Sequence, residues 1–255
     1  MPLNRRQASL LPIALTAALA RAEGRAPLRI GWSDFPPFQR RGENGQPQGL
    51  DVDLLELVAQ SAGETLAWSR RPWARQVPDI AQGEQDLMCS ATPTPERLAM
   101  GEFTQPYRNE RVALLALAGE AAPLRRLADL KGRSLRIGFI RGVAFPQAVR
   151  EAFEDLELAG MLVPLHANDL TLSSLRGRRV DYVIDDPATL LYRAERQHGE
   201  ALKVVLELAV SPVHIFVSRH VLLQRPELLQ RLNAGLQRAR QRPEWQRVLA
   251  RYPGV

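Results

Sequence analysis

Strand–helix alternation runs through the first hundred residues of this chain and constrains its fold more than any other feature. Leu28 to Trp32 is an apolar strand, and the segment from Gly49 to Ala62 keeps its leucines and valine at helical spacing. A strand near residues 65–69, a helix over 73–82 and a buried strand from Asp86 to Ala91 follow. Alternation of this kind predicts a parallel α/β sheet.

The alternation restarts near Gly119 and is followed by a helical tail. A strand from Arg111 to Ala118 precedes this glycine, and a short alanine-rich stretch follows it. Beyond it we expect strands at 135–140, 162–165, 180–184, 202–208 and 213–218, and helices over 145–158, 169–177, 226–240 and 244–252, with one more after Asp186-Pro187. If the tail returns to the first half, two strands join two lobes into a hinged clamp with a ligand cleft.

The N-terminus has the pattern of a secretory signal peptide. Arg5-Arg6 precede an uncharged run from Ala8 to Ala20, and Ala20-Arg21-Ala22 is an A-x-A cleavage site. The run is too short to span a bilayer, and the alternative is a buried N-terminal helix. The paired arginines are also compatible with export by the twin-arginine route. We expect a periplasmic protein divided into a signal peptide (1–22), lobe 1 (23–114), lobe 2 (115–210) and a segment returning to lobe 1 (211–255).

Charge and cysteine content exclude several classes of function. Residues 1–22 carry three arginines and no acid, so the formal net charge falls from +6 to +3 once they are removed. That charge is too small to indicate a nucleic-acid partner. Cys89 is the only cysteine, which excludes an intrachain disulfide and a multi-cysteine metal site. The four histidines lack metal-ligand spacing, and P-loop, dinucleotide and hydrolase motifs are absent, so we expect no metal or cofactor.

One short segment places a cation where a helix dipole disfavours it. Thr94 is a suitable N-cap, Pro95 suits the first helical position, and Arg97 then lies in the first turn. The dipole disfavours a cation there by roughly 0.3–1 kcal/mol. An anion that regularly occupies the spot would explain the arrangement. A surface ion pair with Glu96 or Glu102, worth about 0–1 kcal/mol, would explain it equally well.

Taken together, these segments make the chain resemble the family 3 extracellular solute-binding proteins, which serve polar amino acid ABC importers. The resemblance covers about residues 28–252 and rests on the order and spacing of its parts. These are Pro37-Phe38, Gly49 through Leu54, Gly83 through Asp86, Thr94 through Arg97, Thr104 through Tyr107, Asp129 through Gly132, Gly177 through Asp181 with Asp186, and Asn233 with Arg251-Tyr252. It implies a two-lobed periplasmic binding protein (Venus flytrap) fold with two hinge crossovers. It also implies a monomer that captures an amino acid and delivers it to an ABC permease in the inner membrane.

The resemblance also implies roles for particular residues of the first lobe. Arg97 matches the arginine that binds the ligand α-carboxylate, which suits the planar, two-pronged guanidinium. Ser90 and Thr92 match nearby polar contacts. Phe35 and Trp73 match aromatic residues that enclose the ligand side chain.

In the second lobe, the resemblance implies that Asp186 binds the α-ammonium group, with Asp185 as the alternative. Asp186 is equally suited to cap the helix that begins at Pro187. Val143 replaces the threonine usual after the first strand of this lobe, so only backbone N–H groups remain there to bind the carboxylate. Trp32 stands where members selective for basic ligands often carry an acid, which argues against a lysine- or arginine-type ligand.

Arg75 is compatible with a different kind of ligand, one that carries an acidic group. It adds a cation near the expected cleft, either for an acidic ligand group or as a solvated helix residue.

Two other functions fit the same scaffold. One is a cleft enzyme resembling the periplasmic cyclohexadienyl dehydratases, which would need Asp185 or Asp186 as a general acid of raised pKa. The other is a sensory module that reports to a membrane partner, although such modules are often fused to a membrane span or kinase that this sequence does not show. We expect a binding protein rather than an enzyme.

Overall fold

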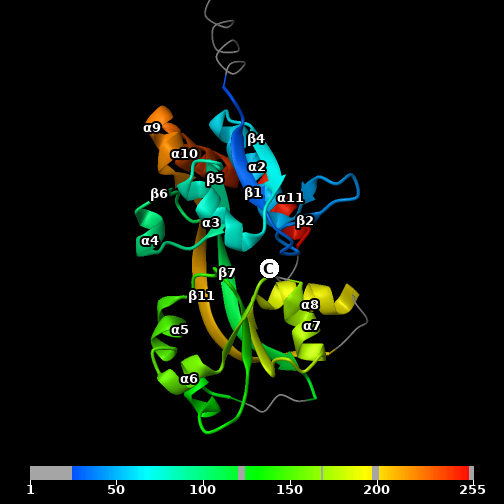
Figure 1. The fold of residues 1–255 in the computed structure, drawn as a ribbon. Helices are drawn as coiled ribbons and strands as arrows, with labels where there is room; N and C mark the ends of the chain where they lie inside the picture. Colours follow the sequence, from blue (N-terminus) through cyan, green and yellow to red (C-terminus); the bar gives the residue numbers. More distant parts are fainter. Residues whose placement is uncertain (1–24, 120–123, 168, 197–200, 253–255) are drawn as a thin grey trace, which may run out of the picture.

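Two lobes joined by a pair of long antiparallel strands make up the chain (Figure 1). The structure, a computed structural model, describes residues 25–119, 124–167, 169–196 and 201–252. The predicted signal peptide at residues 1–22 lies outside the described residues. In the described part of the chain, no helix combines the length and apolar character needed to cross a membrane.

Lobe 1 is a mixed sheet covered by helices from both ends of the chain. Its parallel strands are β4 (Leu66–Arg70), β1 (Leu28–Trp32) and β5 (Leu87–Ala91), in that order. A small hairpin is formed by β2 (Arg40–Arg41) and β3 (Pro47–Gln48). The short strand β6 (Gly101–Phe103) pairs with the second hinge strand. The helices are α2 (Leu50–Ala62), α3 (Trp73–Ala81), α4 (Pro95–Leu98), α9 (Arg219–Gln224), α10 (Leu228–Gln241) and α11 (Pro243–Ala250).

Lobe 2 repeats the parallel pattern on a smaller scale. Its strands are β10 (Tyr182–Asp185), β8 (Ile137–Ile140) and β9 (Leu162–Leu165), in that order. Its helices are η1 (Leu127–Leu130, a 3-10 helix), α5 (Gln147–Ala152), α6 (Leu156–Gly160), α7 (Leu170–Arg176) and α8 (Pro187–Arg196). The helix expected over 145–158 is two helices instead. Asp155 breaks it by accepting the N–H groups of Glu157 and Leu158 and so capping α6.

The hinge consists of β7 (Arg108–Leu117) and β11 (Leu202–Ser218), which pair along nearly the whole length of β7. The two strands expected at 202–208 and 213–218 are one, because the intervening residues continue the ladder with β7 past two irregularities in register. Residues 113–115 already pair with β10 of lobe 2. Strand β7 therefore belongs to both lobes, and the boundary expected after residue 114 falls within it.

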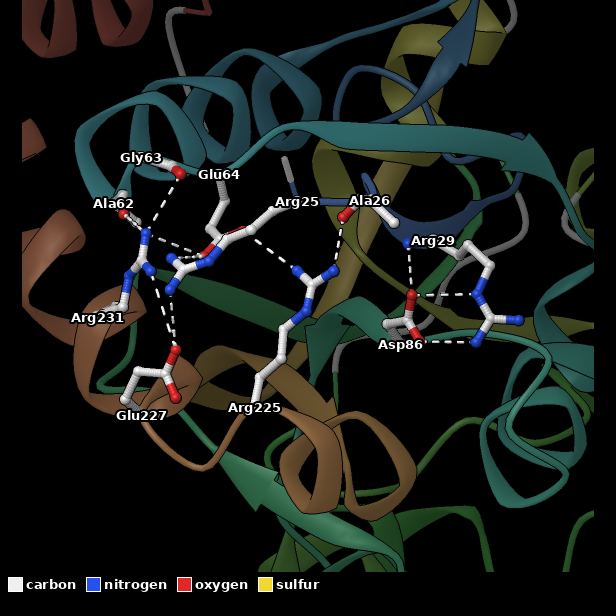
Figure 2. Close-up of polar contacts among 10 residues, drawn as sticks. All are labelled: Arg25, Ala26, Arg29, Ala62, Gly63, Glu64, Asp86, Arg225, Glu227 and Arg231. Carbon is white, nitrogen blue, oxygen red and sulfur yellow. Dashed lines mark hydrogen bonds and ion pairs between the residues drawn. The ribbon is translucent and has the colours of Figure 1, made fainter. Parts of the chain in front are cut away.

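The tail returns to lobe 1 and is fixed there by close packing and by arginines. Gly235 of α10 lies so close to α2 that a Cβ there would come within 2.8 Å of the Val58 carbonyl oxygen. Nearby, the buried carboxylate of Glu64 forms ion pairs with Arg225 and Arg231 of the tail and with Arg25 (Figure 2). The second crossing that the clamp requires is therefore present.

Candidate functional site

A cleft between the lobes contains most of the residues predicted to bind ligand. Its walls come from lobe 1, from lobe 2 and from both hinge strands. They include seven of the eight predicted residues: Phe35, Trp73, Ser90, Thr92, Arg97, Val143 and Asp186. Trp32 is the exception, because its ring is buried in lobe 1 with the Arg70 guanidinium 6.0 Å from the ring centroid. The structure does not bring Trp32 to the cleft.

Arg97 is a buried cation in the wall of this cleft. Thr94 caps α4 by accepting the Arg97 backbone N–H at 3.2 Å, as the sequence predicts. The Arg97 residue is only 5% exposed, and its Nη1 donates to the Thr92 carbonyl at 2.9 Å. Among the described residues it forms no ion pair, so the surface pairs considered with Glu96 and Glu102 are not present. Because burial disfavours its charge, the pKa of Arg97 is lowered.

Ser90 lines the cleft, but its hydroxyl group is hydrogen-bonded to buried side chains behind the cleft wall. The hydroxyl donates to Asp51 Oδ2 at 2.5 Å and accepts from Arg108 Nη2 at 3.1 Å. Its backbone N–H donates to the Tyr107 hydroxyl at 3.0 Å. The Ser90 φ of 51° lies in the left-handed region, a strained conformation that persists only where the surroundings determine it strongly. This network supplies those surroundings, so Ser90 shapes the floor of the cleft.

The centre of that network is a fully buried ion pair at the root of the hinge. Asp51 is 0% exposed, and Arg108 donates to it through Nε at 2.6 Å and Nη2 at 3.1 Å. Gln39 donates to Asp51 at 3.3 Å, and the Arg108 guanidinium lies 3.9 Å from the Phe38 ring centroid. The pair links α2 to β7. Sequence reasoning missed it because the two partners are 57 positions apart and nothing local connects them.

The two predicted aromatic residues lie at the cleft, and one of them also bridges the lobes. Phe35 stacks on Phe38 with centroids 4.9 Å apart. Trp73 donates its indole N–H to the Gly142 carbonyl of lobe 2 at 3.1 Å. A second bridge joins Arg193 of α8 to the Asp34 carbonyl at 2.6 Å. The lobes are therefore in direct contact across the cleft.

On the lobe 2 side, the carboxyl groups of Asp185 and Asp186 both line the cleft. Asp186 Oδ1 accepts the Ala188 N–H at 2.8 Å and so caps α8, while its Oδ2 accepts the Arg111 N–H of β7 at 3.2 Å. Burial raises its pKa. Asp185 Oδ1 accepts the Asp186 N–H at 2.8 Å, and burial raises the pKa of Asp185 to about 6. Asp186 is thus both a helix cap and a cleft residue.

The turn after β8 offers less to a ligand than expected. The Val143 N–H, predicted to be available for a carboxylate, donates to the Ile140 carbonyl at 3.2 Å. The Val143 side chain is partly exposed at the cleft. Gly142 has a φ of 86°, which favours glycine, and its carbonyl accepts the Trp73 bond. This turn therefore contributes to lobe contact and to an apolar wall.

Glu110 is a cleft residue that sequence reasoning missed. It lies on β7 opposite Ser211 of β11, and both residues line the cleft. Burial raises its pKa to about 8; Arg108 opposes this effect, and Asp186, Asp51 and Asp185 add to it. A glutamate in an otherwise ordinary strand carries no local signal, so only the three-dimensional arrangement identifies it.

As far as the structure describes the chain, the cleft combines one cation without an ion pair, three carboxyl groups and apolar walls. In the described residues, no group of three histidine, cysteine or acidic side chains could hold a metal ion. Two α/β lobes, two hinge strands and a cleft of this chemistry define a hinged solute-binding protein. The sequence model for "Bacterial extracellular solute-binding proteins, family 3" matches residues 28–255, and the chain belongs to that family.

Known relatives agree with this family in sequence and in fold. A "Probable histidine-binding protein" of Neisseria gonorrhoeae is 22% identical over 225 residues, which are 86% of this chain and 80% of the relative. "ABC transporter arginine-binding protein 1" of Escherichia coli (strain K12) is 24% identical over 157 residues, 61% of each chain. The solved structure titled "An ancestral arginine-binding protein bound to arginine" has a TM-score of 0.77 and 25% identity, covering 90% of this chain and 99% of its own.

Proposed function

We propose that this protein is the periplasmic substrate-binding component of an ABC importer and that it captures an amino acid in the interlobe cleft. The observation that carries the proposal is the Arg97 guanidinium, buried in the cleft wall without a paired carboxylate among the described residues. A buried cation of this kind is stabilised when an anion binds to it. Relatives named for histidine and arginine binding support an amino acid as the ligand.

The geometry supports a particular orientation of the ligand. Its carboxylate binds Arg97, and its ammonium group faces the carboxyl groups on the hinge and on lobe 2. Phe35 and Trp73 lie beside the ligand side chain and bury its apolar part, at about 25 cal/mol per Å². Micromolar affinity corresponds to about −8 kcal/mol, which these contacts supply after the loss of ligand freedom.

Ligand binding is coupled to delivery through the hinge. Because the walls belong to both lobes, a bound ligand favours the arrangement in which the lobes touch. That arrangement is what we expect an inner-membrane permease to recognise, with the binding protein acting as a periplasmic monomer. We expect no nucleic acid, metal or cofactor to take part.

A thermal-shift panel of the standard L-amino acids and small organic acids tests the proposal. An amino acid at a hundred times its dissociation constant should stabilise the folded protein by about 2.7 kcal/mol. The absence of a shift with every amino acid would contradict it. The same ligands should be recovered unchanged, and conversion of prephenate or L-arogenate would show a cleft enzyme instead.

A further inference from the structure

Glu110 and Arg97 face the same cavity without touching. Both line the cleft, and no ion pair joins them within the described residues. They are nevertheless within electrostatic reach, because the charge of Glu110 opposes the effect of burial on the pKa of Arg97. Arg97 can bind the negative end of a zwitterion and Glu110 its positive end. Their separation therefore suits a zwitterionic ligand that lies between them.

The other two cleft carboxyl groups are already engaged with the protein. Asp186 accepts backbone N–H groups on both oxygens and holds α8 against β7. Asp185 Oδ1 accepts the Asp186 N–H, and its Oδ2 is buried without a hydrogen-bond partner among the described residues. The charge of Arg193 in α8 opposes the effect of burial on the pKa of Asp185. Glu110 accepts no hydrogen bond from any described residue. Of the three described cleft carboxylates, Glu110 is therefore the one with both oxygens available to a ligand.

We propose that Glu110, rather than Asp186, binds the ligand ammonium group and that the cleft consequently selects amino acids whose side chains are neutral or cationic. This inference rests on the proposed function. A second acidic group in the ligand would add a negative charge beside Glu110, Asp185 and Asp186, with Arg97 as the only unpaired cation among the described lining residues. Acidic amino acids and dicarboxylates are therefore disfavoured.

Ligand binding at Glu110 should release a proton, and this release can be measured. Its carboxyl is faced by Arg108 and Asp51 from lobe 1, by Asp185 and Asp186 from lobe 2 and by Arg97 across the cleft. Because its pKa is about 8, Glu110 is mostly protonated at pH 7 before a ligand binds. A ligand ammonium favours the ionised carboxylate, so binding should release close to one proton per ligand.

Calorimetry in two buffers tests the assignment. L-Arginine, L-glutamine and L-glutamate are titrated into the wild type at pH 7 in phosphate and in Tris, whose ionisation enthalpies differ. We expect binding of L-arginine or L-glutamine, no binding of L-glutamate, and release of close to one proton. Glu110→Gln should weaken binding by about 10- to 100-fold and abolish proton release.

Two further variants distinguish a failure of the Glu110 assignment from a failure of the proposed function. Glu102→Gln is the control, because Glu102 lies on β6, is exposed and is outside the cleft lining; it should bind as the wild type does. Asp186→Asn removes one of the charges that raise the pKa of Glu110, so its proton release should decrease but not disappear. If Asp186→Asn loses that release entirely, or if Glu110→Gln binds normally, the Glu110 assignment is overturned while the proposed function stands. If no amino acid binds the wild type, both are overturned.

Discussion

Glu110 and Arg97 are ionisable cleft residues whose charged forms reduce the stability of the folded protein. Burial without a partner disfavours the charged form of each, raising the pKa of Glu110 to about 8 and lowering the pKa of Arg97. Such groups are retained in proteins where a ligand uses them. They account for binding chemistry that the apolar walls alone could not supply.

The raised pKa of Glu110 predicts how stability depends on pH. A carboxyl whose folded pKa lies above its unfolded value of 4.5 binds its proton more tightly in the folded protein. Its contribution to stability is therefore fully present below pH 4.5 and is lost as the pH rises through about 8. Urea unfolding of the ligand-free protein should show Glu110→Gln gaining stability relative to the wild type at pH 7 and 9, but not at pH 4.5. Parallel stability–pH curves would contradict this.

The buried pair of Arg108 with Asp51 should be far more important to folding than an exposed pair. Arg108→Met leaves a carboxylate that is 0% exposed without its partner, which we expect to cost about 3–5 kcal/mol. Arg247→Met removes the ion pair with Glu244, whose two side chains are 72% and 39% exposed, and the expected loss is about 1 kcal/mol or less. Urea unfolding measures both. Equal losses would show that burial of the hinge pair has no special role.

At the scale of elements, the contact between α2 and α10 holds the returning tail on lobe 1. Gly235→Ala would place a Cβ within 2.8 Å of both the Ala62 Cβ and the Val58 carbonyl oxygen, and the helices would have to separate. We expect a loss of about 1–3 kcal/mol, although alanine is the better helix former. In α6, Gly160→Ala meets no atom within 4 Å and should be neutral or stabilising. Denaturation of both variants measures the difference, and a stable Gly235→Ala protein would contradict the packing argument.

The sequence predicted most helices and strands because their signals are local. Apolar spacing located α2 and β1, and the Thr94-Pro95 cap located α4. The sequence analysis expected two strands where the structure has β11 alone. This strand pairs with β7 and then with β5, so its burial follows no single pattern. Glu110 and the Arg108 pair were missed for a related reason: their environment is created by segments distant in the sequence.

At the scale of the whole molecule, closure depends on a few bonds between the lobes. Trp73→Phe keeps a ring beside Arg97 but removes the bond to the Gly142 carbonyl. We expect amino acid affinity to fall about two- to tenfold, since one hydrogen bond contributes about 0.5–1.5 kcal/mol. Small-angle scattering should also show a more open ligand-free protein.

Trp68→Phe is the matched control for this experiment. It removes the indole bond to Glu56 at 2.7 Å, which lies outside the cleft lining, and should leave affinity unchanged. Equal affinity losses in the two variants would show that the Trp73 bond does not act through closure.

The central claim, that Arg97 binds a ligand carboxylate, is tested most directly by calorimetry on Arg97→Gln. The titrants are the amino acid with the largest thermal shift and its amide, in which the carboxylate is replaced. We predict that the wild type prefers the acid by about 30-fold or more, and that Arg97→Gln binds both weakly and alike. The variant should fold as the wild type does, and Arg247→Gln, on the exposed pair with Glu244, should bind normally. Wild-type affinity for the amino acid in Arg97→Gln would contradict the account.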